Sequence, residues 1–143
     1  MVTEHEIGDK PNDWLIREDR DWDISLVSRS QVMRANGECI ASRRRELFSK
    51  YLAQLKGLSA LPLFSELPHD VAPYIFLLLL DKPTRDFAPL KQAALPLYRW
   101  EEMAVTDCTV ADDYRQRLVK LPCHQSLSDY EVAWMIAKLR ELL

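Results

Sequence analysis

The chain has 143 residues, of which 48% are hydrophobic and 29% charged, and its formal net charge is −3. This length and composition are typical of one globular domain. A small negative charge provides no basic surface field, so neither nucleic acid nor anionic lipid is expected as a partner. The longest apolar run, Tyr74–Leu80, is far too short to span a bilayer, and no membrane segment is expected.

Cysteine usage and the first residues indicate the compartment. Cys39, Cys108 and Cys123 are widely spaced and form no CxxC pair. An odd number of cysteines favours free thiols in a reducing compartment over a disulfide framework. The first residues have neither the basic start nor the apolar core of a signal peptide. The sequence therefore predicts a cytoplasmic protein.

The first 23 residues differ in composition from the rest of the chain. Residues 1–23 contain eight Asp or Glu against three Lys or Arg. Such a segment has little apolar surface to bury, so we predict a loosely ordered acidic arm there and a domain over residues 24–143. Trp14 and Trp22 either fold back onto this domain or dock on a partner.

Two helices are predicted at the start of the domain. Apolar residues between Ile24 and Met33 indicate a short helix that ends near Asn36-Gly37. A longer helix follows and is stopped by Gly57, because its apolar residues recur at spacings of three and four; they are Ile40, Leu47, Phe48, Tyr51, Leu52 and Leu55. We expect the basic run Arg43–Arg45 to lie on a solvated helix face and not to form a phosphate site.

The middle of the chain predicts strands around one helix. Leu61–Phe64 is a short extended piece, and the apolar run Tyr74–Leu80 fits a strand covered on both faces, with a short buried helix as the alternative. Asp86 is expected to cap the next helix, which places Pro89 in its first turn. Leu95–Trp100 returns as a strand, and Pro96 confines it to a sheet edge or a strand end.

The C-terminal stretch predicts a helical turn or two over Val110–Arg117, a short strand, and a capped amphipathic helix. Ser128-Asp129-Tyr130-Glu131 is a capping box, with Leu127 and Val132 at the staple positions beside it. One apolar stripe follows, formed by Val132, Met135, Ile136, Leu139 and Leu143. This order of elements predicts an α+β fold: a two-layer sandwich of a small, mostly antiparallel sheet with helices packed on it.

Few residues have the spacing that catalysis or metal binding requires. Cys123 and His124 are adjacent, and adjacent residues of a strand point to opposite faces, so a cysteine–histidine nucleophile is disfavoured. Cys108, Cys123 and His124 lack the ligand spacing of known zinc modules, and no metal site is predicted. The only glycines are Gly8, Gly37 and Gly57, too few for a phosphate-binding loop. No catalytic residue is therefore assigned.

One polar cluster is a candidate binding site. Tyr98, Arg99 and Trp100 place a phenol, a guanidinium and an indole together at a strand end. Such a group can recognise a sugar, a carboxylate or a phosphate, with the arginine as the anion-binding fork. An edge strand that packs its aromatic side chains on the core is the alternative.

The order of these segments resembles the C-terminal small domain of the DegT/DnrJ/StrS aminotransferases, which are fold-type I, pyridoxal-phosphate enzymes that in many cases aminate keto-sugar nucleotides. The resemblance covers roughly Ser28 to Leu143. It rests on the helix RRRELFSKYL, the strand PYIFLLLL before a charged turn, and the ending LPCHQSLSDYEV. His124 and Gln125 match the family's closing motif, whose role we interpret as structural.

The resemblance implies a fold and a partner. In this family a preceding large domain carries the Schiff-base lysine and the groups that bind pyridoxal phosphate. The resemblance therefore implies a closing domain that needs a separate large domain or aminotransferase subunit, whether as a fragment, a split-gene subunit or a remnant. Pyridoxal phosphate is the cofactor of the parent family, and none is expected to bind this chain alone. Tyr98, Arg99 and Trp100 would approach the substrate.

Two further expectations accompany this hypothesis. The alternative function is a non-catalytic interaction module that retains the fold. In either case, separation from a large domain would leave apolar surface exposed, so we expect a concentration-dependent homo-oligomer or aggregation.

Overall fold

The computed structural model describes residues 24–99 and 107–143, so the acidic arm predicted over residues 1–23 and Trp100 lie outside the described residues. The chain divides into two units between Ala35 and Asn36. The predicted boundary between residues 23 and 24 stays a prediction.

The described part of the first unit is the helix α1, Leu26–Arg34, as predicted. Ser25 is its N-cap residue, and the Ser25 hydroxyl oxygen accepts a hydrogen bond of 3.1 Å from the Ser28 amide. None of its residues is buried.

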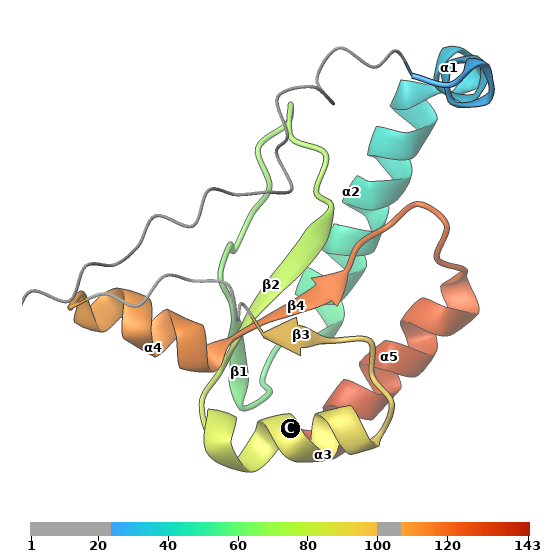
Figure 1. Cartoon of the computed structure of the whole chain (residues 1–143). Helices are drawn as coiled ribbons and strands as arrows, with labels where there is room; N and C mark the ends of the chain where they lie inside the picture. The colour runs from blue at the N-terminus through green and yellow to red at the C-terminus, as the bar shows by residue number, and fades with distance from the viewer. Residues whose placement is uncertain (1–23, 100–106) are drawn as a thin grey trace, which may run out of the picture. The chain divides into compact units, whose positions relative to one another are not determined.

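The second unit carries the sheet (Figure 1). Its elements follow in the order α2 (Gly37–Gln54), β1 (Ala60–Pro62), β2 (Ile75–Leu80), α3 (Pro83–Gln92), β3 (Tyr98–Arg99), α4 (Thr109–Arg117), β4 (Leu118–Pro122) and α5 (Asp129–Leu142). The strands lie in the order β1-β2-β4-β3, and every pair is antiparallel. The predicted α+β sandwich is confirmed, and β3 lies at a sheet edge as Pro96 indicated.

The core lies between one face of the sheet and the helices α2, α3 and α5. Phe76 of β2 contacts the rings of Phe48 and Tyr51 of α2, with centroid distances of 5.0 and 5.1 Å. Leu90 of α3 and Leu139 of α5 belong to the same buried cluster. Burial of these large apolar side chains is the main favourable term in folding.

The strand β2 corrects one prediction. Its side chains alternate between buried and half-buried, so it is not covered equally on both faces. Phe76, Leu78 and Leu80 point to the core. We call the opposite side the second face. By strand register it carries Leu61, Ile75, Leu77, Leu79, Tyr98, Leu118, Lys120 and Pro122, of which Leu118 is buried. An unbroken apolar sequence conceals this alternation, because leucine occupies both faces.

The start of α3 corrects a second prediction. The helix begins at Pro83, and Lys82 is the N-cap residue, so Asp86 is not a cap. Proline is favoured at the first helical position because its φ is already helical and because an N–H at that position would have no hydrogen-bond partner within the helix. Asp86 is instead buried at 2% exposure and paired with Arg85. Pro89 lies inside the helix and not in its first turn.

The C-terminal helix is confirmed in detail. The Ser128 amide donates to Glu131 Oε2 at 2.8 Å, and the Glu131 amide donates to Ser128 Oγ at 3.2 Å. These two bonds are the predicted capping box. The predicted stripe faces the core, with Leu143 only partly buried and the rest buried. Gly57 follows α2 at φ +80°, a conformation that glycine adopts without strain.

Candidate functional site

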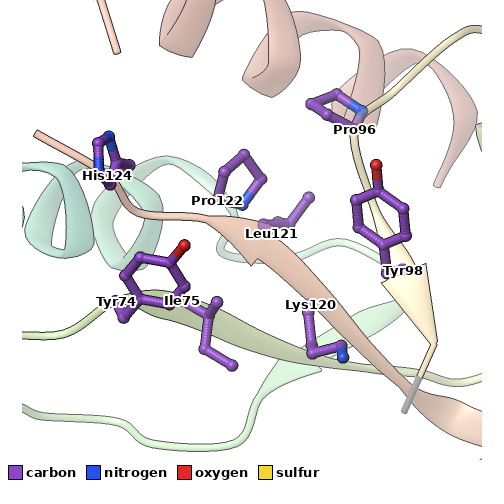
Figure 2. A pocket seen from close by; sticks show the side chains of 8 residues that line it. All are labelled: Tyr74, Ile75, Pro96, Tyr98, Lys120, Leu121, Pro122 and His124. Atoms are coloured by element: carbon purple, nitrogen blue, oxygen red, sulfur yellow. The ribbon is translucent and has the colours of Figure 1, made fainter. Parts of the chain in front are cut away.

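A pocket of about 270 Å³ lies on the second face of the sheet (Figure 2). Three strands and the segments beside them supply its walls. The lining residues are Tyr74 and Ile75 at the start of β2, Pro96 and Tyr98 at β3, Lys120, Leu121 and Pro122 on β4, and His124 just after β4.

Strand register brings these residues together. Tyr98 pairs with Lys120, and Ile75 pairs with Pro122, so both pairs share one side of the sheet. Tyr98 is 63% exposed and its ring faces the Lys91 ammonium at 4.8 Å. The central position of β4 therefore joins two segments that are far apart in the sequence.

The other end of the pocket is formed by two rings. The ring of Tyr74 meets the imidazole of His124 edge-on, with a centroid distance of 6.0 Å. Tyr74 is 65% exposed. The His124 Nδ1 accepts a hydrogen bond of 3.3 Å from the Ser126 amide. In a neutral imidazole this leaves the proton on Nε2, which is then a donor.

Helix α2 holds the segment between β4 and α5 in place. The Arg44 Nε donates to Gln125 Oε1 at 2.8 Å, and the Arg44 guanidinium lies 5.3 Å from the centroid of the Tyr74 ring. The Cys123 thiol donates to the Arg44 carbonyl oxygen at 3.2 Å, and the Tyr51 hydroxyl donates to the Pro122 carbonyl oxygen at 3.1 Å. Arg44 thus contacts Cys123 and Gln125, the residues on either side of His124 in the chain.

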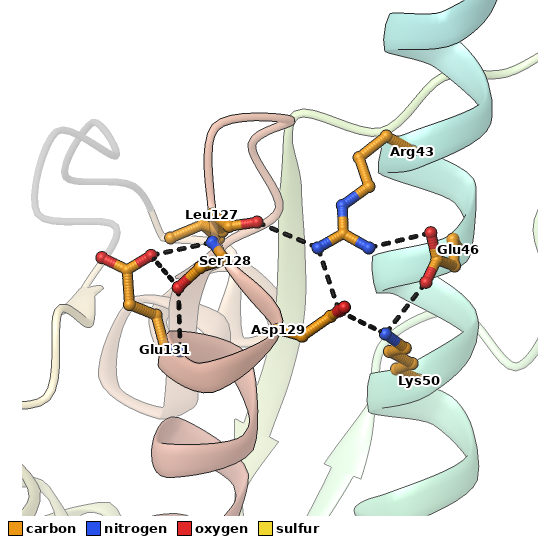
Figure 3. A network of polar contacts seen from close by, with 7 residues as sticks. All are labelled: Arg43, Glu46, Lys50, Leu127, Ser128, Asp129 and Glu131. Carbon is orange, nitrogen blue, oxygen red and sulfur yellow. Dashed lines mark hydrogen bonds and ion pairs between the residues drawn. The ribbon is translucent and has the colours of Figure 1, made fainter.

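A network of charges continues this connection (Figure 3). The Arg43 guanidinium donates to the Leu127 carbonyl oxygen and to Asp129 Oδ1, both at 3.0 Å. The Lys50 ammonium lies 2.6 Å from Asp129 and 2.9 Å from Glu46. The hydrogen bonds from Lys50 and then Arg43 hold the pKa of Asp129 below its usual value.

The prediction of a solvated face for Arg43–Arg45 is therefore wrong for two of its three residues. Arg43 and Arg44 bind side chains and carbonyl groups about 80 residues further along the chain. The sequence conceals this role because their partners become neighbours only when β4 and α5 pack against α2. Each exposed ion pair of this kind stabilises the fold only weakly. We therefore expect the network mainly to fix the position of the loop between β4 and α5.

The structure separates the three predicted site residues. Tyr98 lines the pocket, whereas Arg99 points to the other side of β3, where its guanidinium lies 3.9 Å from the centroid of the Phe87 ring. Adjacent strand residues point to opposite faces, so Tyr98 and Arg99 cannot serve one pocket together. Trp100 lies outside the described residues. The assignment of these residues to substrate binding stays a prediction.

Sequence reasoning missed three residues of the pocket. The sequence indicates only strand positions for Tyr74 and Lys120, and for His124 it disfavours a nucleophile or zinc site and suggests a structural motif. The missing signal was the register between β2 and β4, which places Ile75 opposite Pro122. The order of the strands could not be read from short apolar segments alone.

Cys123 is unsuited to nucleophilic chemistry. Its side chain is fully buried, and burial raises the pKa of its thiol to about 11. The thiolate is the nucleophilic form, so the group stays neutral and unreactive near pH 7. Cys39 and Cys108 are exposed, and none of the three cysteines forms a disulfide. Within residues 24–99 and 107–143 no group of three His, Cys, Asp or Glu could hold a metal ion.

No helix in the described part of the chain is long and apolar enough to cross a membrane.

Three solved structures that are similar in fold to this chain are aminotransferases. TlmJ from Streptoalloteichus hindustanus matches with a TM-score of 0.65 and 21% identity over 80% of this chain and 34% of TlmJ. A DegT DnrJ EryC1 StrS aminotransferase from Brucella abortus matches with a TM-score of 0.62 and 18% identity over 81% of this chain and 33% of its own. A protein assigned as a sugar aminotransferase from Streptococcus pneumoniae, in its PMP form, matches with a TM-score of 0.59 and 16% identity over 72% of this chain and 30% of its own.

The chain thus shares the fold of about one third of each of these aminotransferases, and the fold expected from the sequence resemblance is confirmed. No family model matches the sequence, and no curated protein sequence matches it.

Proposed function

We propose that the chain is the small domain of a pyridoxal-phosphate-dependent aminotransferase of the sugar type and that it acts with a separate, cofactor-binding large domain. The observation that carries this proposal is the second face of the sheet. The chain spans about a third of the aminotransferases that share its fold, and the second face is the side of the sheet opposite the core helices.

The second face has the composition of an interface. Leu61 is 59% exposed on β1, and Ile75, Leu77 and Leu79 of β2 are only half-buried. Tyr98 adds an exposed ring at the other edge. Contiguous exposed apolar side chains of this kind mark interaction sites in soluble proteins. The large domain would cover this face, and the pocket would then lie between two domains, where ligand sites preferentially occur.

The pocket does not fit the cofactor by itself. Pyridoxal phosphate, when bound, carries the amino group between substrates through its aldehyde carbon. Its sites need a lysine, a carboxylate for the pyridine nitrogen and a phosphate cradle. Lys120 lines the pocket, but the lining contains no carboxylate and neither Gly37 nor Gly57. The large domain would therefore supply the cofactor site, and this chain would contribute one wall of the substrate site.

The test is to isolate the tagged chain from its native cells, reduce it with borohydride and analyse it by mass spectrometry. Borohydride fixes a lysine-bound cofactor as phosphopyridoxyl-lysine. We expect a co-isolated polypeptide that carries this modified lysine in about equal amount, and no modified lysine in this chain. A co-isolated partner without the modification would overturn the proposal and favour the alternative, a non-catalytic interaction module.

Two variants make this experiment specific. Leu61→Lys places a charge on the second face and should abolish co-isolation. Tyr130→Lys is the control, because Tyr130 is an exposed apolar residue that lies on α5 and not on the second face, so the complex should stay intact. Equal retention of the partner by both variants would exclude the second face as the interface.

A further inference from the structure

A cleft beside Arg99 lies on the helix side of the sheet, opposite the second face. It has a volume of about 480 Å³ and is formed by the start of α3, by β3 and by the end of α4. Its described lining residues are Pro83, Thr84, Phe87, Ala88, Arg99 and Gln116. We call it the Arg99 cleft, because Arg99 is the only charged residue among them. The described lining therefore has a positive charge and no carboxylate.

Two contacts from α3 hold the Arg99 guanidinium in place. Its central carbon lies over the Phe87 ring, 3.9 Å from the ring centroid, which is a cation–π contact. Its Nη2 atom donates a long hydrogen bond of 3.4 Å to the Pro83 carbonyl oxygen. Both contacts fix the position of the charge at the wall of the cleft, and neither of them neutralises it.

Most of the hydrogen-bonding capacity of this guanidinium is unused. An arginine has five N–H donors, and the Pro83 carbonyl is the one acceptor that the described residues give to Arg99. Its Nε atom is buried and has no hydrogen-bond partner. Asp86 of α3 is paired with Arg85, and no carboxylate of the described residues forms an ion pair with Arg99. Buried donors without a partner are rare because they are costly, so the cleft lacks an acceptor.

The missing acceptor fits a carboxylate better than a phosphate. Both anions match the planar fork of an arginine. A carboxylate carries one charge, which the single cation of the described lining can balance. A phosphate group carries about 1.5 to 2 negative charges near pH 7. The excess charge would lie without a partner beside Pro83, Phe87 and Ala88, and burial of an unpaired charge is unfavourable.

Two uncharged residues of the lining can complete the bonding of a carboxylate. The hydroxyl of Thr84 is a donor. The side-chain amide of Gln116 has two N–H groups, of which one donates to Asp112 at 3.3 Å, and the other is available. The volume of about 480 Å³ equals roughly sixteen water molecules at about 30 Å³ each. This is room for a carboxylate with a short aliphatic chain behind it.

We infer that the Arg99 cleft binds a carboxylate, presented either by a free organic acid or by an acidic side chain of a bound protein segment. The Arg99 guanidinium is the fork that bonds to it, and the Phe87 ring orients the fork. The site is separate from the pocket at Tyr98, because Tyr98 and Arg99 point to opposite faces of β3. The inference therefore does not rest on the proposed function.

The experiment is a titration of the full chain, followed by NMR of the backbone amides and of the arginine Nε–H groups. The probes are glutarate, N-acetyl-glutamate methylamide and its neutral analogue N-acetyl-glutamine methylamide. We expect saturable shifts of the Arg99 Nε–H and of the amides of residues 84–88 with at least one of the two carboxylates. The glutamine analogue should bind about tenfold more weakly, because a hydrogen bond to a charged group is lost.

The two carboxylate probes distinguish the sources of the ligand. Tighter binding of glutarate identifies a free acid. Tighter binding of the blocked glutamate identifies an acidic side chain of a protein segment, because only this probe carries the peptide groups on both sides.

Matched variants assign the binding to Arg99. Arg99→Lys keeps the charge but removes the planar fork, so it should weaken carboxylate binding about tenfold. Arg115→Met is the control, because Arg115 lies on α4, is paired with Asp112 and does not line the cleft. Thr84→Val should weaken binding about fivefold through the loss of one neutral hydrogen bond, and it provides the same test if Arg99→Lys does not fold.

Inorganic phosphate is the competing anion in the same titration. The absence of saturable shifts with both carboxylates would overturn the inference, as would tighter binding of phosphate than of either carboxylate. An equal effect of Arg99→Lys and Arg115→Met would also overturn it, since the binding would then depend only on the general positive charge of this region. None of these results decides the proposed function, because the titration uses this chain alone and reports on the side of the sheet opposite the second face.

Discussion

The Nε atom of Arg44 donates a hydrogen bond of 2.8 Å to the side-chain oxygen of Gln125, although 80 residues separate them in the chain. The same guanidinium lies against the ring of Tyr74. One arginine therefore connects helix α2 to two segments that border the pocket. Its removal should affect pocket geometry more than global stability.

Replacement of Arg44 by methionine tests this relationship. We expect Arg44→Met to shift and broaden the ring resonances of Tyr74 and His124, and to lower the free energy of unfolding by about 1 kcal/mol, since one charge-assisted hydrogen bond is lost near the surface. NMR spectra and urea unfolding measure the two effects. Arg45→Met is the control, because the structure gives Arg45 no hydrogen bond or ion pair to the described residues. The same ring shifts in both variants would contradict the role of Arg44.

The capping box predicts a pH dependence. Hydrogen bonds from the Ser128 amide and then its hydroxyl hold the pKa of Glu131 below its usual value. A carboxylate whose folded pKa is depressed stabilises the fold above its unfolded pKa of about 4.3, and this contribution disappears as pH falls through the folded pKa. The native chain should therefore lose stability from about pH 5 downward.

Glu131→Gln isolates that contribution, because glutamine can still accept from the Ser128 amide but does not titrate. Urea unfolding at about pH 5, 4 and 3 should show a shallower loss of stability in Glu131→Gln than in the native chain. Glu66→Gln, on an exposed loop, should keep the native slope. A native slope in Glu131→Gln would mean that the capping carboxylate is not the titrating group.

The thiols predict a difference in reactivity. Cys39 and Cys108 are exposed, whereas Cys123 is buried and donates to the Arg44 carbonyl oxygen. With the pKa of Cys123 raised to about 11, a disulfide reagent such as Ellman's reagent should label two thiols quickly at pH 8 and the third only after unfolding. Three fast thiols in the native chain would show that the β4 end opens readily.

The exposed apolar second face predicts self-association of the isolated chain. Sedimentation over a range of concentrations should show an oligomer or aggregate that increases with concentration. Leu61→Lys should reduce it, since Leu61 is an exposed residue of that face, whereas Tyr130→Lys should not. A monomer at every concentration would show that the second face does not cause self-association of the isolated chain.

Features that depend on contacts within a few residues could be predicted from the sequence, whereas contacts between distant segments could not. The cap of α5 was readable from Ser128 and Glu131 because both its hydrogen bonds close within three residues. The same holds for the helix that ends before Gly57. The start of α3 was misread because Asp86 resembles a cap, whereas Pro83 begins the helix.

The sequence by itself determined the α+β class, the helices, the edge position of β3 and the capped C-terminal helix, because propensities, caps and proline restrictions act over a few residues. Only the tertiary structure decided that β4 lies between β2 and β3. That register places Tyr74, Lys120 and His124 at one pocket and turns Arg99 away from Tyr98. Strand pairing across 40 residues depends on the packing of the whole core, and no local pattern encodes it.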